Sequence, residues 1–180
     1  AIREVLSNKF GVGNSVFRTG IQGVQEVETV PFGCWKRGVF DKYGYYDVRL
    51  VRNQDIELNK RIFHGGGKIV IIPDTYSTYL ARETYSKLAK NNFGNGKWNI
   101  LTVFYTGELK SLSIRHFVPL GFVLGLFLPL IAGIFWCPAL FVTIAVLLMY
   151  ILALGSVCAK LAISKKLNFF YLLTSFTVLH

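Results

Sequence analysis

The feature that most constrains this chain is the sudden loss of charge at Phe117. All ten acidic residues precede it, as do all but three of the twenty Lys and Arg residues. Residues 117–180 carry only Lys160, Lys165 and Lys166. A segment of that length with so few charges has no polar face to present to water. We therefore expect two parts, residues 1–116 in water and residues 117–180 in a membrane.

Two uncharged stretches in the second part have the length of membrane-spanning helices. They cover residues 117–136 and 139–159, and about 20 apolar residues suffice to cross the hydrocarbon core of a bilayer. We expect a helical hairpin with a tight turn at Cys137 and Pro138. Apolar residues resume at about residue 168, where we expect a third membrane helix to begin and to be cut by the end of the chain.

The charges that flank this hairpin predict its orientation. Arg115 and His116 precede the first helix, whereas Lys160, Lys165 and Lys166 follow the second, and the turn carries no charge. Positive residues accumulate in cytoplasmic loops of membrane proteins. The pattern predicts a multi-pass protein of the cell (inner or plasma) membrane with residues 1–116 in the cytoplasm.

The net charge of +10 raises the question of a nucleic-acid partner. The basic residues are dispersed among acidic ones instead of forming a run, so we expect no nucleic acid and favour an anionic membrane surface or substrate. The three cysteines lie far apart in the sequence. Their spacing indicates neither a disulfide framework nor a zinc site, and we assign no metal ligand in this chain.

Helical and strand patterns alternate in the first part of the chain. Residues 30–40 predict a strand or loop that enters a short helix, and residues 53–63 predict a helix that stops at the glycines at 65–67. Residues 68–72 are a short β-branched strand, and residues 86–93 have a helical pattern. This order is typical of the α/β class.

Asp55 is the residue in this part with the clearest potential for chemistry. At the start of a helix, the unpaired backbone amides and the positive end of the dipole stabilise a carboxylate. An ionised and fixed carboxylate can take the proton from a hydroxyl group as its oxygen attacks, which is general-base catalysis. The alternative is that Asp55 only caps the helix.

The motifs of the first part, in this order, resemble the later part of family 2 glycosyltransferases, and most closely the succinoglycan-synthesis type of membrane glycosyltransferase. The similar segments are residues 10–20, residues 29–62 (TVPFGCWKRGVFDKYGYYDVRLVRNQDIELNKRI), GGGKIVIIPD from residue 65, and KLAKNNFGNGKWN at 87–99. In proteins of that type, such a segment leads into membrane helices. The resemblance covers nearly all of residues 1–116.

This resemblance implies the C-terminal part of a GT-A (nucleotide-diphospho-sugar transferase) fold followed by transmembrane helices. It also implies an inverting transfer from a nucleotide-sugar donor to a lipid-linked or polysaccharide acceptor at the cytosolic membrane face. Mg²⁺ or Mn²⁺ would bind the donor diphosphate. The sequence contains no Asp-x-Asp motif, so we expect the metal ligands and the donor-binding half to lie upstream and this fragment alone to be inactive.

The resemblance also assigns roles to residues near Asp55. In the sequence Asn53-Gln54-Asp55, Asp55 stands where the family has the Asp proposed as catalytic base, and Asn53 and Gln54 would contact the substrates. Phe32 and Gly33 would line the acceptor side.

A second set of binding residues comes from the segment NNFGNGKW, at the place where processive family members carry Gln-x-x-Arg-Trp. Asn91 replaces the common Gln and Gly94 the common Arg, whereas Lys97 and Trp98 keep a basic and aromatic pair. The resemblance would give Asn91, Lys97 and Trp98 contacts with acceptor and donor, and it leaves processivity open. The alternative function is a non-catalytic binding or scaffold module anchored in the membrane.

Overall fold

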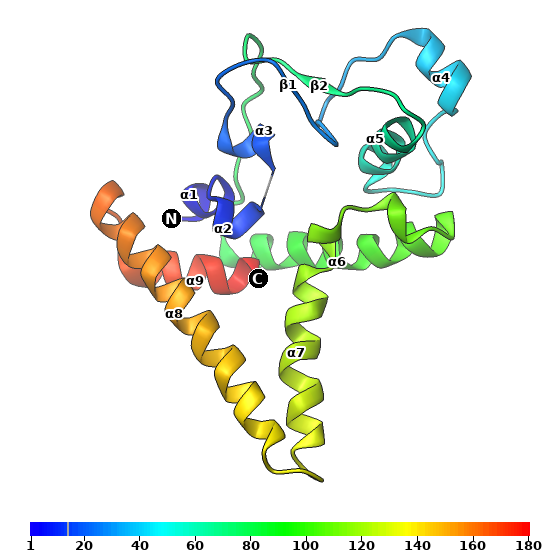
Figure 1. Ribbon diagram of the computed structural model, residues 1–180. Coiled ribbons are helices and arrows are strands. Elements are labelled where there is room, and N and C mark those ends of the chain that lie inside the picture. The colour runs from blue at the N-terminus through cyan, green and yellow to red at the C-terminus, as the bar shows by residue number, and fades with distance from the viewer. Residues whose placement is uncertain (14) are drawn as a thin grey trace. The chain divides into compact units, whose positions relative to one another are not determined.

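The computed structural model describes residues 1–13 and 15–180, and the chain is mostly helical (Figure 1). It divides into two compact units. The apolar unit comprises residues 1–13, 81–88 and 117–180, and the polar unit comprises residues 15–80 and 89–116 among those described.

The polar unit is built from short helices and one small sheet. Its helices are α3 (Val16–Thr19), α4 (Arg37–Tyr43), α5 (Gln54–His64), most of α6 (Tyr85–Thr106), and the 3₁₀ turns η1 (Leu109–Ser111) and η2 (Ile114–His116). The strands β1 (Gln25–Glu26) and β2 (Val70–Ile71) pair antiparallel, with Gln25 opposite Ile71 and Glu26 opposite Val70.

The expected α/β class is met only in part, because the described residues are mostly helical and contain little sheet. The β-branched run at 68–72 contracts to the two residues of β2, because β1 is its one partner among the described strands. Val70 and Ile72 point to the same face and each keep 45% of their surface exposed, so that face carries no covering layer, whereas Ile69 on the other face is buried. A β-branched composition favours a strand, but a strand of normal length needs neighbours to pair with.

Helix α5 confirms the helix expected from Asn53. Asn53 adopts the left-handed conformation with φ of 65°, and the helix ends at His64 before the glycines. Gly66 has φ of 80°, which an L side chain rarely tolerates. The apolar face of α5 packs through Leu58 and Ile62 against Ile69, and these three buried residues form the core of the unit.

Helix α6 is much longer than the helix expected at 86–93. It continues through Gly94 and Gly96 to Thr106. A glycine costs a helix only about 1 kcal/mol relative to alanine, and side chains from the chain before α5 bind this part of α6, as described below. Tertiary contacts therefore override the helix-breaking tendency of the two glycines.

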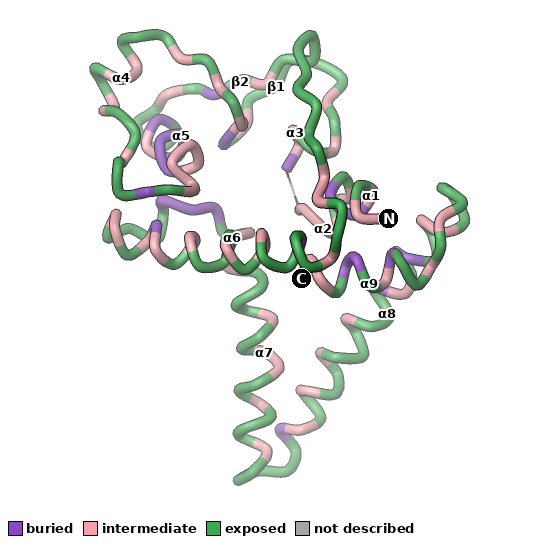
Figure 2. Tube along the Cα trace, turned by 180° about the vertical axis from the view of Figure 1, so that it is seen from behind, coloured by how far each residue is buried: buried purple, intermediate pink, exposed green. Residues whose placement is uncertain are grey.

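The apolar unit consists of helices around one small core. They are α1 (Ile2–Leu6), α2 (Lys9–Val12), α7 (Val118–Ala132), α8 (Ala139–Lys165) and α9 (Phe169–Leu179). Its core contains Val5, Leu154, Cys158, Leu172 and Phe176, contributed by α1, α8 and α9. Figure 2 shows the outer parts of α7 and α8 as mainly exposed.

The apolar helices agree in part with the expected membrane segments. In the described part of the chain, α8 alone is long and apolar enough to span a membrane, judged by length and composition. The helix expected at 117–136 ends at Ala132, because turns follow and Gly133 lies so close to Leu140 that a Cβ atom would overlap it. The helix expected at 139–159 continues to Lys165.

Helix α9 begins where the third apolar stretch was expected. The side-chain oxygen of Asn168 accepts hydrogen bonds from the backbone amides of Phe170 at 2.9 Å and Tyr171 at 3.2 Å. These bonds satisfy two of the amides that a helix leaves unpaired at its first turn.

Candidate functional site

Asp55 is half-buried in the first turn of α5. One carboxylate oxygen accepts a hydrogen bond from the backbone amide of Ile56 at 2.9 Å. The other has no donor among the described residues. The side chain therefore satisfies a first-turn amide, as a plain cap would, and keeps one oxygen available.

Aromatic side chains lie beside this carboxylate. Tyr46 is 36% exposed, and burial raises its pKa, with the negative charge of Asp55 as the second cause. The Trp35 ring meets the Tyr46 ring edge to face, with centroids 5.9 Å apart. Phe40 stacks on Tyr45 at 5.3 Å. Trp35, Phe40, Tyr45 and Tyr46 are here called the aromatic cluster, and Tyr46 is the member on which the charge of Asp55 acts.

The two predicted acceptor-side residues differ in their relation to this cluster. A Cβ atom on Gly33 would lie 2.8 Å from the Trp35 ring, so the indole requires glycine there. Phe32 has φ of 53° and is 86% exposed. The structure therefore brings Gly33 to the aromatic cluster and leaves Phe32 projecting into the surroundings.

Polar side chains join the start of α5 to α6. The Arg52 guanidinium donates to the side-chain oxygen of Asn95 at 2.9 Å and to the backbone and side-chain oxygens of Asn91 at 3.4 Å. The side-chain amide of Asn53 donates to Asn99 at 2.9 Å and to Thr102 at 3.3 Å. Two predicted site residues, Asn53 and Asn91, are thus brought to the same junction.

Arg52 is a residue that the sequence reasoning missed. A Cβ atom on Gly94 would lie 3.2 Å from its guanidinium carbon, so Arg52 fills the space that a side chain at position 94 would need. The signal was the glycine at the place where the resembled motif carries Arg. The guanidinium of Arg52 occupies the space beside Gly94.

The other predicted binding residues, Gln54, Lys97 and Trp98, have different surroundings. Gln54 is half-buried as the first residue of α5, and Lys97 is exposed on α6. Trp98 is half-buried, and its backbone oxygen accepts a hydrogen bond from Thr102 at 2.6 Å. No hydrogen bond or ion pair links these three side chains to Asp55 in the part of the chain that the structure describes.

A polar cavity of about 300 Å³ lies on another face of α5. Its lining residues are Glu57, Lys60, Arg61, His64, Gly65, Glu108, Lys110 and Ser111. The four α5 side chains follow the spacing of one helix face, whereas Asp55 is two residues from Glu57 and points away from that face. Asp55, the predicted base, therefore does not line this cavity.

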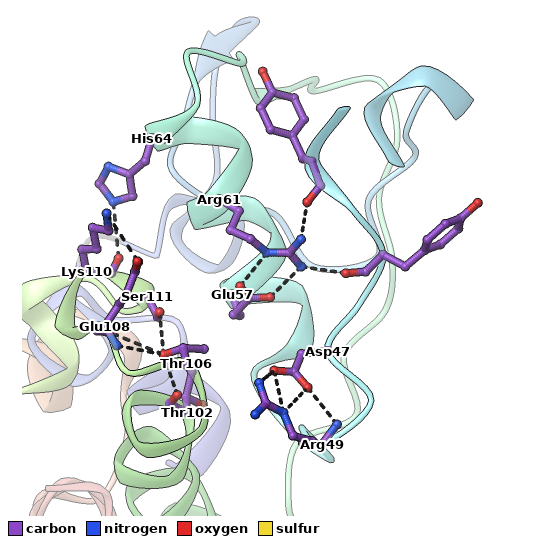
Figure 3. Close-up of polar contacts among 12 residues, drawn as sticks. Asp47, Arg49, Glu57, Arg61, His64, Thr102, Thr106, Glu108, Lys110 and Ser111 are labelled. Carbon is purple, nitrogen blue, oxygen red and sulfur yellow. Dashed lines mark hydrogen bonds and ion pairs between the residues drawn. The ribbon is translucent and has the colours of Figure 1, made fainter. Parts of the chain in front are cut away.

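Charge pairs fix the walls of this cavity, as Figure 3 shows. Arg61 lies 2.6 Å from Glu57, and it also donates to the backbone oxygens of Tyr43 and Tyr45. His64 lies 3.3 Å from the backbone oxygen of Lys110. The cavity can accept a polar ligand, but its charged groups already have protein partners.

Glu28 forms an ion pair with the buried Lys60. Its carboxylate accepts a hydrogen bond from the Ser113 hydroxyl at 2.6 Å and lies 3.1 Å from the Lys60 ammonium. Ser113 and then Lys60 hold the pKa of Glu28 below its usual value of 4.5. A lowered pKa stabilises the fold above pH 4.5, and that stability is lost as pH falls through the folded-state pKa.

Replacing Ser113 with Ala is expected to raise the pKa of Glu28 toward 4.5 and to reduce this acid sensitivity. The pKa is measured by NMR titration of the Glu28 side chain. The control is Ser111→Ala, because the equally buried Ser111 donates to Thr106 instead. An unchanged Glu28 pKa in the Ser113 variant would contradict this assignment.

The described residues do not fit a site for the implied Mg²⁺ or Mn²⁺. They contain no group of three or more His, Cys, Asp and Glu side chains that could hold a metal ion. Hard divalent cations need several oxygen ligands gathered at one point.

Comparison of the chain with protein-family models, curated protein sequences and solved structures found no match. The resemblance to family 2 glycosyltransferases remains a prediction from sequence motifs.

Proposed function

We propose that this chain supplies the acceptor side, the catalytic base and the membrane helices of an inverting glycosyltransferase with a GT-A fold. The enzyme transfers a sugar from a nucleotide-sugar to a lipid-linked or polysaccharide acceptor at the cytosolic membrane face. The donor-binding residues and the metal ligands belong to a part of the enzyme outside these 180 residues.

The observation that supports this proposal is the carboxylate of Asp55, which has one oxygen unpaired among the described residues and acts electrostatically on Tyr46 of the aromatic cluster. Sugar rings have faces of C–H bonds that pack on aromatic rings, and hydroxyl groups at their edges. Trp35 and Tyr46 offer the apolar surface, and the unpaired oxygen of Asp55 offers the acceptor for a hydroxyl proton. The two requirements of an acceptor sugar thus meet at one place in the polar unit.

In the proposed reaction, Asp55 takes the proton of an acceptor hydroxyl as its oxygen attacks the anomeric carbon of the donor. The new C–O bond forms on the face opposite the leaving group, so the configuration inverts. The bond from the anomeric carbon to the diphosphate breaks, and its electron pair leaves with the diphosphate. A base held at hydrogen-bond distance contributes about 10² to 10⁴ to such a rate.

The second candidate is a non-catalytic binding module anchored in the membrane. It is favoured by the cavity between Glu57 and Lys110, because that cavity is preformed, lined by fixed charges and remote from Asp55. Such a module would bind a polar ligand there without transferring a group.

Donor binding distinguishes the two candidates. The protein is purified with the donor-binding half included and titrated by calorimetry with a panel of nucleoside diphosphate sugars, with Mg²⁺ or Mn²⁺ present. The glycosyltransferase proposal predicts saturable binding of at least one donor, at concentrations from about 1 μM to 1 mM. Absence of binding across the panel would overturn it and favour the module.

A further inference from the structure

One face of α6 is apolar and exposed. Phe93, Ile100 and Phe104 have exposed fractions of 78%, 70% and 76%. Residues seven and eleven positions after Phe93 return to its side of a helix with 3.6 residues per turn. These three side chains therefore form one continuous stripe, here called the apolar stripe of α6.

The face of α6 that contacts the polar unit is polar instead. Arg52 binds it through Asn91 and Asn95, and Asn53 binds it through Asn99 and Thr102. A helix between a protein core and water normally buries its apolar stripe and exposes its polar side chains. Helix α6 instead exposes its apolar stripe and turns polar side chains toward the polar unit. Contact of that stripe with water is unfavourable, so we expect another medium to cover it.

The charged residues of α6 indicate which medium covers the apolar stripe. The helix carries Lys87, Lys90 and Lys97 and contains no Asp or Glu. Lys90 precedes Phe93 by three residues, and Lys97 precedes Ile100 by three, so both lie along the edge of the apolar stripe. Large apolar side chains bordered by lysines are typical of helices that lie in the interface of an anionic bilayer.

The position of α6 in the chain supports a membrane over a protein partner. Residues 107–117 join it to the apolar hairpin of α7 and α8, of which α8 has the length and composition of a membrane span. We propose that the apolar stripe of α6 lies in the headgroup region of an anionic bilayer, with Lys90 and Lys97 binding lipid phosphates. This inference does not depend on the catalytic role of Asp55.

Fluorescent labels on α6 test the proposal in the full chain reconstituted in phosphatidylcholine–phosphatidylglycerol vesicles. Cys34 and Cys137 are exposed and are replaced with Ser, whereas the buried Cys158 stays. A single label is then attached to Ile100→Cys or Phe104→Cys, and Asp41→Cys on α4 is the exposed control. Because all three side chains are at the surface or nearly so, the replacements remove little packing.

The proposal predicts strong quenching by brominated lipids at positions 100 and 104, and iodide quenching several-fold weaker there than at position 41. Equal iodide quenching at all three positions would place the stripe in water and overturn the proposal. Protection from iodide without quenching by brominated lipids would show that protein covers the stripe, which also overturns it.

A charge variant tests the lipid headgroup separately. Lys90→Gln with Lys97→Gln is expected to weaken lipid quenching at position 100 in anionic vesicles and to leave it unchanged in vesicles of phosphatidylcholine alone. Quenching that is unchanged in both would overturn the role of the two lysines in binding anionic lipid.

Discussion

Replacing Arg61 with Met is expected to lower the free energy of unfolding of the polar unit by at most about 3 kcal/mol, because the Arg61 side chain is 34% exposed and water screens part of the pair. Glu57 retains only 5% of its surface exposed, and Arg61 is its ion-pair partner at 2.6 Å. Without the guanidinium, a buried carboxylate loses its counter-charge. The backbone oxygens of Tyr43 and Tyr45 also lose their donor, so the contact between α5 and the chain after α4 is broken.

The matched control is Arg49→Met. Arg49 pairs with Asp47 at the same 2.6 Å, but its side chain is 55% exposed, so water replaces the lost contact. An exposed pair contributes about 0 to 1 kcal/mol. Hydrogen exchange of the α5 amides in the reconstituted protein measures both losses, and equal losses would show that burial does not set the effect.

A double replacement separates the buried charge from the packing of Arg61. In Glu57→Leu with Arg61→Met, neither side chain is charged, so most of the loss should be recovered. If the α5 amides of the double variant exchange as fast as those of the single Arg61 variant, the loss of stability comes from the missing hydrogen bonds to Tyr43 and Tyr45.

Local sequence signals predicted the elements that local physics determines. The start of α5 at Asn53 and its end before the three glycines follow from helix-termination preferences. Helix α9 begins after Asn168, whose side chain caps it, whereas the side chain of Asn53 makes no cap bond to α5. The loss of charge at Phe117 coincides with the return of the chain to the apolar unit.

The differences arise where distant parts of the chain interact. The β-branched run at 68–72 gave no sign that one short partner would pair with it. The helical pattern was expected over residues 86–93 alone, yet α6 continues to Thr106, where Arg52 and Asn53 bind it from outside the helix. Neither the hydrophobic periodicity nor the composition of a segment reveals contacts with distant parts of the chain.

The site was predictable to a similar extent. Motif order pointed to Asp55 and to the segment around Asn91, and both Asn53 and Asn91 take part in the hydrogen bonds between the start of α5 and α6. The aromatic cluster was not predicted, because the spacing of Trp35 and Tyr46 does not reveal that their rings meet. The polar cavity could not be predicted either, since it joins Glu57 to Lys110 across a long stretch of chain.

Replacing Asp55 with Asn in the complete enzyme is expected to lower the rate of sugar transfer by about 10² to 10⁴. The amide has nearly the same shape, and its oxygen can still accept the hydrogen bond from Ile56. It has no basic oxygen for a hydroxyl proton. The fold and donor binding should therefore be retained while the chemical step is lost.

The control for this change is Asp41→Asn, because Asp41 is an exposed carboxylate on α4. This variant loses the same charge from an exposed position on a different helix of the polar unit. Its transfer rate is expected to match that of the unmodified enzyme, which separates the position of Asp55 from a general effect of net charge.

The decisive measurement is the transfer of radiolabelled sugar at saturating donor, by the unmodified enzyme and the Asp55→Asn variant, with donor affinity measured on the same samples. Equal affinity with transfer reduced at least about a hundredfold is the predicted result. Transfer by the variant at close to the unmodified rate would show that the carboxylate next to Tyr46 takes no proton from the acceptor.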